Sequence, residues 1–403
     1  MMKKTLVALA AAAATGAFAQ VAITGTIDLG IQSRDAQDTT AKSVGLAKNS
    51  TTTSVMGFYG TEDLGGGLKA GFKLEWTLTP EASSSLNAAG QTLPAASGSF
   101  FSGTPFNSEQ FLSLSGNWGT VRAGEPNAAV FRAQGVSQPL GTGLGSGYHS
   151  TTFSRLGYVG GYGIGSFMGN ANGSGSTLRV IRHQKTMQYE TPVMSGFSAM
   201  AEYSVGNDNK TSLNASNTPT FVGLLVNYSA GPLNVAAAYN KYSSGTNGIT
   251  GNVNGSGTSG LTLTTISLGA NADVTYQFLA ANYTVGQNTF YTGMSNVRAS
   301  NATEDSQSWN IAYKFAAAAN LDFYANLVST QSALSGSQLL TLGNGTTVQA
   351  TNNLNKKMLG LGADYRLSKR TALFARYESV DSNTDNTASG ESNITAFGVR
   401  HQF

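Results

Sequence analysis

The sequence has 403 residues, of which 24 are lysine or arginine and 21 are aspartate or glutamate, so its formal net charge is +3. Charged residues make up 11% of the chain, well below the proportion in ordinary soluble domains, and so small a net charge argues against a nucleic-acid partner. The absence of cysteine excludes disulfides, thiolate catalysis and zinc–sulfur sites. Small and polar residues replace the missing charge, which allows either a secreted β-sandwich or solenoid, or an outer-membrane barrel.

The first residues have the pattern of a secretory signal peptide. Lys3 and Lys4 form a charged region, Thr5–Gly16 is a short apolar core, and Ala17–Ala19 is a cleavage site of the A-x-A type. The apolar core is too short to cross a membrane as a helix, and the alternative is a buried N-terminal helix. We therefore expect residues 1–19 to be a signal peptide and residues 20–403 to form one β-barrel domain.

Strict alternation of apolar and polar residues follows, beginning with the segment that opens the mature chain. One face of this segment carries Val21, Ile23, Ile27, Leu29 and Ile31, and the other carries Thr24, Thr26, Asp28 and Gln32. The same alternation holds over the eleven residues from Leu68 to Leu78, which read LKAGFKLEWTL. A membrane-crossing β-strand needs about 9–11 residues. These segments therefore predict two-faced strands with lipid on one side and water on the other.

Short turns and long polar connections alternate along the rest of the chain. The short turns are Glu62–Gly67, Ser115–Gly119, Thr191–Gly196, Ser229–Pro232, Val285–Asn288, Ala316–Asn320 and Leu367–Arg370. Seven hairpins contribute fourteen strands, and the first and last segments add two, which makes sixteen. The last segment, with Phe397, Val399 and Phe403 on one face, is predicted to pair with the first and to close the sheet. The predicted fold is all-β, a 16-stranded antiparallel transmembrane barrel with short periplasmic turns and long outer loops.

Six stretches of the sequence resemble those of a known protein family. They are GFYGTEDLGGGLKAGFKLE, LSGNWGTVRAGE, MQYETPVMSGFSA, NYSAGPLNVAAAY, YRLSKRTALFARYE and GVRHQF. The chain is similar to the Gram-negative general porins, in particular to their betaproteobacterial branch. The resemblance implies a homotrimer of outer-membrane barrels, each a water-filled pore for passive diffusion of ions and small hydrophilic solutes, with the third outer loop folded inside. It also implies that Phe403 belongs to the signal that the outer-membrane assembly machinery reads.

Inward-facing charges are the candidates for function, because a channel selects ions by the charges that line it. The candidate pore-lining and constriction residues are Lys69, Lys73, Glu75, Arg122, Glu125, Arg132, Arg155, Arg179 and Arg182. Further inward positions fall on Arg366, Arg376, Glu378 and Arg400. For each residue the alternative is a structural charge in a local pair, away from the narrowest point. No cofactor, metal or catalytic site is expected.

The third loop and the wall opposite it depart from the family pattern. The 56 residues from Pro126 to Ile181 contain no aspartate or glutamate. On the wall, Val55, Tyr59 and Ser108 stand where relatives carry cations, and Glu125 adds an acid. We therefore expect a weak to moderate anion preference.

Three other functions stay open at this stage. A substrate-specific channel would use aromatic and basic side chains at the constriction to hold a solute. A barrel enzyme would need a nucleophile and a base at the rim, and an adhesin or structural anchor would not conduct ions. The segment Thr79–Asn107 is the candidate latch to a neighbouring subunit.

Overall fold

The computed structural model describes residues 20–36, 43–80, 105–146, 181–183, 185–204, 220–243, 249–252, 261–268, 273–300, 305–332, 338–342, 347–350, 354–384 and 388–403. The signal peptide expected at residues 1–19 lies outside these residues. The described part of the chain is almost entirely β-strand, and it contains one helix, α2 (Ala129–Ser137). No helix within it is long and apolar enough to cross a membrane.

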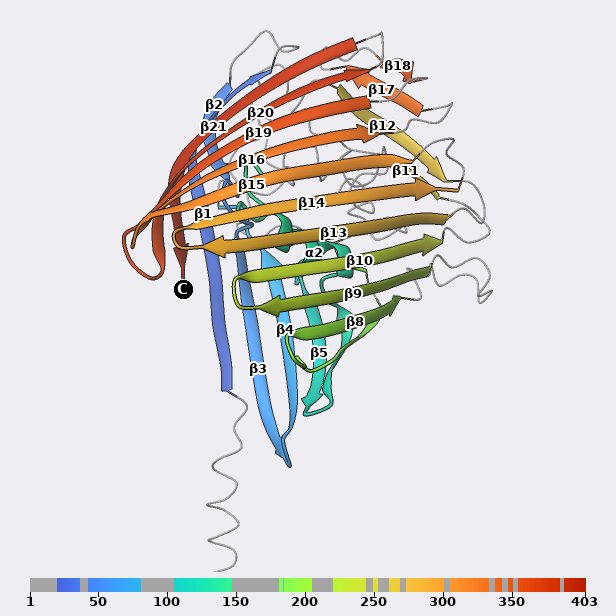
Figure 1. The fold of residues 1–403 in the computed structure, drawn as a ribbon, viewed down its shortest axis with the longest axis vertical. Coiled ribbons are helices and arrows are strands. Elements are labelled where there is room, and N and C mark those ends of the chain that lie inside the picture. The colour runs from blue at the N-terminus through green and yellow to red at the C-terminus, as the bar shows by residue number, and fades with distance from the viewer. Residues whose placement is uncertain are drawn as a thin grey trace, which may run out of the picture.

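Sixteen strands of the described chain form a closed antiparallel barrel, as the turn pattern predicts (Figure 1). They are β1 (Gln20–Ala36), β3 (Val55–Gly65), β4 (Leu68–Thr77), β5 (Gln110–Gly116), β6 (Gly119–Glu125), β7 (Thr186–Glu190), β8 (Phe197–Ser204), β9 (Thr220–Ala230), β10 (Leu233–Ser243), β13 (Asp273–Val285), β14 (Asn288–Ala299), β15 (Ser306–Ala318), β16 (Leu321–Ser332), β19 (Leu354–Arg366), β20 (Thr371–Thr384) and β21 (Ala388–Gln402). Each strand pairs with the next along the chain. All seven predicted short turns join consecutive strands, and the strand ends that lead into the long connections lie at the opposite end of the barrel (Figure 1).

The barrel closes where β21 pairs with β1. The register runs from Thr26 opposite Gln402 to Ala36 opposite Ser392. Phe403 continues the seam, because its N–H and C=O each lie 3.0 Å from their backbone partners on Gly25. Closure leaves neither the first nor the last strand as an unpaired edge, and the predicted pairing of these two strands is confirmed.

The two faces of the wall differ as the alternation predicts. Large apolar side chains such as Ile23, Leu112 and Phe397 are 58–69% exposed, because they point out of the barrel. The residues that alternate with these outer rows point inward, and many of them are polar: Asp28, Asn240 and Asn310 are fully buried. Phe72 lies opposite Leu112, which places its row on the outer face. A wall with apolar residues outside and polar residues inside suits lipid on one side and water on the other.

The second barrel strand is interrupted, which the sequence did not predict. The short strand β2 (Ser43–Lys48) pairs with the C-terminal half of β1, and β3 pairs with the N-terminal half. Residues 49–54 bulge out of the ladder between them. We call residues 49–54 the bulge.

Four further short strands lie in two of the long connections. They are β11 (Ile249–Asn252), β12 (Leu261–Leu268), β17 (Gln338–Leu342) and β18 (Thr347–Ala350). They pair into a separate antiparallel sheet in which β12 and β17 bring the two connections together. This sheet lies at the long-connection end of the barrel (Figure 1).

Candidate functional site

A segment between β6 and β7 folds into the barrel, as predicted for the third loop. We call residues 126–146 the inner segment; it contains α2 (Figure 1). The helix begins against two strands: the Ala129 N–H donates to Glu202 Oε1 on β8 at 2.7 Å, and the Val130 N–H donates to Asn240 Oδ1 on β10 at 2.9 Å. These acceptors satisfy two of the N–H groups that a helix leaves without a partner in its first turn.

Asparagines on later strands hold the rest of the inner segment. Their side-chain amides donate to backbone carbonyls at 2.8–3.0 Å: Asn282 to Val136, Asn310 to Ser137 and Asn326 to Gly145. Glu378 on β20 accepts from the Gly145 N–H at 2.7 Å. The polar side chains that face the lumen therefore replace the backbone partners that an irregular segment lacks. The inner segment is fixed along the wall from β8 to β20.

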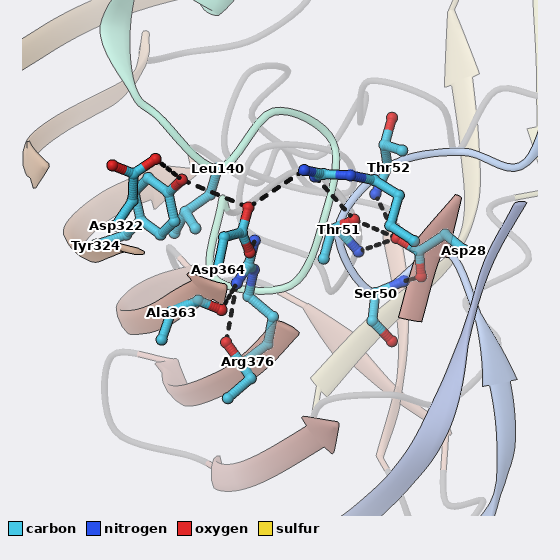
Figure 2. Close-up of polar contacts among 12 residues, drawn as sticks. Asp28, Ser50, Thr51, Thr52, Leu140, Asp322, Tyr324, Ala363, Asp364 and Arg376 are labelled. Carbon is cyan, nitrogen blue, oxygen red and sulfur yellow. Dashed lines mark hydrogen bonds and ion pairs between the residues drawn. The ribbon is translucent and has the colours of Figure 1, made fainter. Parts of the chain in front are cut away.

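The bulge meets the far end of the inner segment. The Leu144 N–H donates to the Ser50 carbonyl at 2.9 Å. Asp28 on β1 holds the bulge, since its carboxylate accepts from the N–H groups of Ser50, Thr51 and Thr52 at 2.7–3.0 Å and from the Thr51 hydroxyl. Figure 2 shows Asp28 facing these three residues. A buried carboxylate is stabilised by several donors of this kind.

Two charged clusters lie on the wall where the inner segment begins. In the first, Lys73 Nζ lies 3.3 Å from Glu75 and 2.5 Å from Glu109. In the second, Glu190 accepts from Arg122 at 2.8 Å and from Arg132 of α2 at 2.7 Å. The second cluster ties the loop cation to the wall through one shared carboxylate.

Two more clusters lie on the wall formed by β15, β16 and β19–β21. Asp364 accepts from Arg376 at 2.7 Å, and its other oxygen lies 3.4 Å from Arg400. Asp322 lies between Lys314, at 3.4 Å, and Arg366. Figure 2 shows Asp364 and Arg376 close together, with Asp322 and Tyr324 on one side of them and the Asp28 contacts on the other.

The balance of charge differs among these clusters. Three of the four contain two cations for each carboxylate, and only the Lys73 cluster has two carboxylates for one cation. Ion pairs cancel charge only where the numbers match. Together these four clusters hold seven cations and five carboxylates, and the inward-facing carboxylates of Asp28, Glu202 and Glu378 lie outside them.

The predicted site residues divide into several groups. Lys73, Glu75, Arg122 and Arg132 come together beside the inner segment, in the clusters above. Lys69 lies far from them, exposed next to the short turn between β3 and β4. Arg155 and Arg179 lie outside the described residues.

Arg182 and Glu125 lie at the two ends of the third loop. Arg182 donates to Asn127 Oδ1 at 3.1 Å, which joins the return of the loop to its start. Glu125 is not where the sequence led us to expect it. It pairs across the sheet with Gln110, in the row of Leu112 and Ala123 that faces outward, and the Gln110 amide donates to it at 3.3 Å. Its side chain is buried at the edge of an outer hollow of about 340 Å³ rather than in the lumen.

Sequence reasoning missed the carboxylates that organise the clusters. Glu109, Asp322 and Asp364 were not among the candidates, although each is a partner of a predicted or inward-facing cation. The alternation of Asp322 and Asp364 with the apolar rows of β16 and β19 could have placed them inward. Among the described residues, no group of three or more potential metal ligands is close enough together to hold an ion.

Comparison with known proteins agrees with the geometry. The family model for Gram-negative porins matches residues 5–385 of the chain. The outer membrane porin protein 32 of Delftia acidovorans is 32% identical over 58% of this chain and 58% of its own length. An outer membrane porin protein of Bordetella pertussis is 26% identical over the full length of both. The chain thus spans less than two thirds of the Delftia relative and all of the Bordetella one.

Solved structures share the fold. An anion-selective porin from Comamonas acidovorans superposes with a TM-score of 0.67 at 20% identity, covering 96% of this chain and 100% of that one. OmpT of Vibrio cholerae, solved in a trimer form, gives a TM-score of 0.55 at 13% identity and covers 95% of this chain and 99% of that one.

Proposed function

The chain belongs to the Gram-negative porin family, and on that premise we propose that it forms a water-filled outer-membrane channel for passive diffusion of ions and small hydrophilic solutes. One observation carries the proposal. A closed barrel with an apolar outer face holds the inner segment against its inner wall by hydrogen bonds, so that the segment permanently narrows the lumen. Such a segment sets the size and charge of what can pass.

The fixed charges support a weak to moderate preference for anions. The described inner segment carries Arg132 and no acid, and three of the four charged clusters hold two cations for one carboxylate. Permeating anions therefore meet a favourable potential, and cations an unfavourable one. Because the charges face water, salt screens them within about 8 Å at physiological ionic strength.

Assembly into a homotrimer belongs to the same proposal. The outer face of β3 and β4 carries an aromatic cluster, in which the rings of Phe58 and Trp76 lie 6.2 Å and 5.9 Å from that of Phe106. Aromatic anchors of this kind are enriched at protein interfaces. Export by a signal peptide at residues 1–19, contact with outer-membrane lipid and capture of Phe403 by the assembly machinery complete the proposed route to the membrane.

The proposal is tested with purified protein in a planar bilayer. Under a KCl gradient we expect discrete conductance steps and a reversal potential that gives a chloride-to-potassium permeability ratio above one. Light scattering in detergent, corrected for bound detergent, should give the mass of three chains. A folded barrel that conducts no current would refute the channel, and a ratio below one would refute the anion preference alone.

A further inference from the structure

The wall formed by β15, β16 and β19–β21 carries a row of cations that the sequence did not assign to the constriction. Lys314, Arg366 and Arg400 come from β15, β19 and β21. Arg366 also donates to the Ala319 carbonyl in a short turn at 2.9 Å, and Arg400 donates to Thr51 in the bulge at 3.3 Å. The row therefore runs from the short-turn end of the barrel to the place where the inner segment meets the wall.

A hydrogen-bonded chain joins the three cations into one unit. Asp322 holds Lys314 and Arg366, and Asp364 lies beside Arg400. The Tyr324 hydroxyl lies 3.2 Å from Asp322 and 3.4 Å from Asp364, between the two carboxylates (Figure 2).

The cations of this unit are more exposed to the lumen than its carboxylates, and this difference decides which charge a solute meets. The side chains of Asp322 and Asp364 are 2% and 6% exposed, whereas those of Lys314, Arg366 and Arg400 are 33%, 37% and 25% exposed. The carboxylates are hidden behind the cations that they position. In the Lys73 cluster, by contrast, the lysine and both glutamates are exposed to a similar, small extent.

Arg400 is the cation best placed to bind a passing ion. Within the described chain its guanidinium makes two long contacts, at 3.3 Å to Thr51 and 3.4 Å to Asp364. Arg376 is different, since it is 3% exposed, donates three hydrogen bonds of 2.7–2.9 Å and lies 5.4 Å from the Tyr324 ring. A guanidinium has five N–H donors in a planar fork that suits carboxylate and phosphate oxygens. Arg376 therefore has a structural role, whereas the Arg400 guanidinium has N–H groups that can donate to a passing anion.

We propose that Lys314, Arg366 and Arg400 form a cationic track that binds small inorganic and carboxylate anions in passing and sets the anion selectivity of the channel. This inference rests on the proposed function. It adds a selective element on the wall of β15–β21 to the charged clusters beside β3–β6, where the family pattern would seek it. A permeating anion would pass from cation to cation between the inner segment and the short-turn mouth.

The track is tested by removing one charge at a time and measuring the chloride-to-potassium permeability ratio. A unit charge about 6 Å from an ion changes the local ion concentration about threefold in water, and about twofold at 0.1 M salt. Removing a cation lowers local chloride and raises local potassium, so we expect Arg400→Gln and Lys314→Gln each to lower the ratio about two- to fourfold in 0.1 M KCl, and Arg400→Lys to preserve it. Lys69→Gln removes one exposed charge beside the short turn between β3 and β4, three strands away from Arg400 around the barrel, and it should change the ratio by less than half as much.

Inorganic phosphate supplies a second readout. Added on the short-turn side, it should lower the chloride current of the unmodified channel more than that of Arg400→Gln. Migration on unheated gels checks that each variant is folded, and Lys314→Gln keeps the test valid if Arg400→Gln does not fold. An unchanged ratio in folded variants, or an equal loss in Lys69→Gln, would overturn the track while leaving the channel intact. Absence of current from the unmodified protein would instead overturn the proposed function.

Discussion

Replacing Asp28 by alanine should release the bulge from the wall. The carboxylate is fully buried and accepts from three backbone N–H groups and one hydroxyl. Each buried donor left without a partner costs about 1–3 kcal/mol. Water from the lumen can replace some of these contacts, so we expect a loss of about 3–5 kcal/mol in the stability of this region.

The expected result is a barrel that unfolds at lower urea concentration and conducts with more noise. The noise follows because the bulge also holds the inner segment, through the Ser50 carbonyl and the Leu144 N–H. Asp28→Asn keeps the shape and one acceptor oxygen, so it should fall between alanine and the native protein. Tryptophan fluorescence during urea unfolding in lipid vesicles gives the stability, and single-channel recording gives the noise.

Asp63 offers a matched control. Its carboxylate is exposed and accepts one hydrogen bond, from the Gly65 N–H at 2.9 Å. Asp63→Ala should therefore cost less than about 1 kcal/mol. If Asp28→Ala unfolds at the same urea concentration as Asp63→Ala, with unchanged current noise, then Asp28 does not hold the bulge and the reasoning fails.

Three further predictions test other parts of the wall. Glu190→Gln removes the carboxylate that two arginines share, so the chloride-to-potassium permeability ratio should rise by roughly twofold at 0.1 M KCl. An unchanged ratio would show that this cluster lies off the ion path. Leu112→Lys on the outer face should lower the free energy of unfolding in vesicles by about 2–4 kcal/mol, whereas Ser113→Lys on the inner face should change it little. Equal losses would contradict the assignment of the two faces. Gly25→Ala would place a methyl group 2.4 Å from the Phe403 ring, so the temperature at which the barrel unfolds on a gel should fall. The expected loss of unfolding free energy is about 1–3 kcal/mol. An unchanged temperature would contradict the packing at the seam.

The barrel could be predicted from sequence because its physics is local. Alternation of side chains tells which face of a strand meets lipid, and short breaks in that alternation tell where a strand ends. All seven short turns and the pairing of β1 with β21 follow from these two rules. The interruption at residues 49–54 did not follow, since it depends on Asp28, which lies more than 20 residues away in sequence.

The candidate site was less predictable. Alternation tells which face of the strand a side chain lies on, but not its position along the barrel axis or the residue it contacts. Arg122 and Arg132 were among the candidates, yet their shared contact with Glu190 depends on how the inner segment folds across the lumen. Glu125 shows the opposite error. Its position two residues after Ala123 already placed it on the outer face, and comparison with a family motif outweighed that simpler argument.

The most direct test of the account is chemical labelling of single cysteines along β5. The chain contains no cysteine, so each introduced thiol reports alone. With the protein in lipid vesicles, a charged, membrane-impermeant thiol reagent should label Ser113→Cys and Ser115→Cys, which face the lumen. It should leave Leu112→Cys and Leu114→Cys unlabelled. Labelling of the leucine positions together with protection of the serine positions would mean that water does not fill the barrel, and the proposed channel would be contradicted.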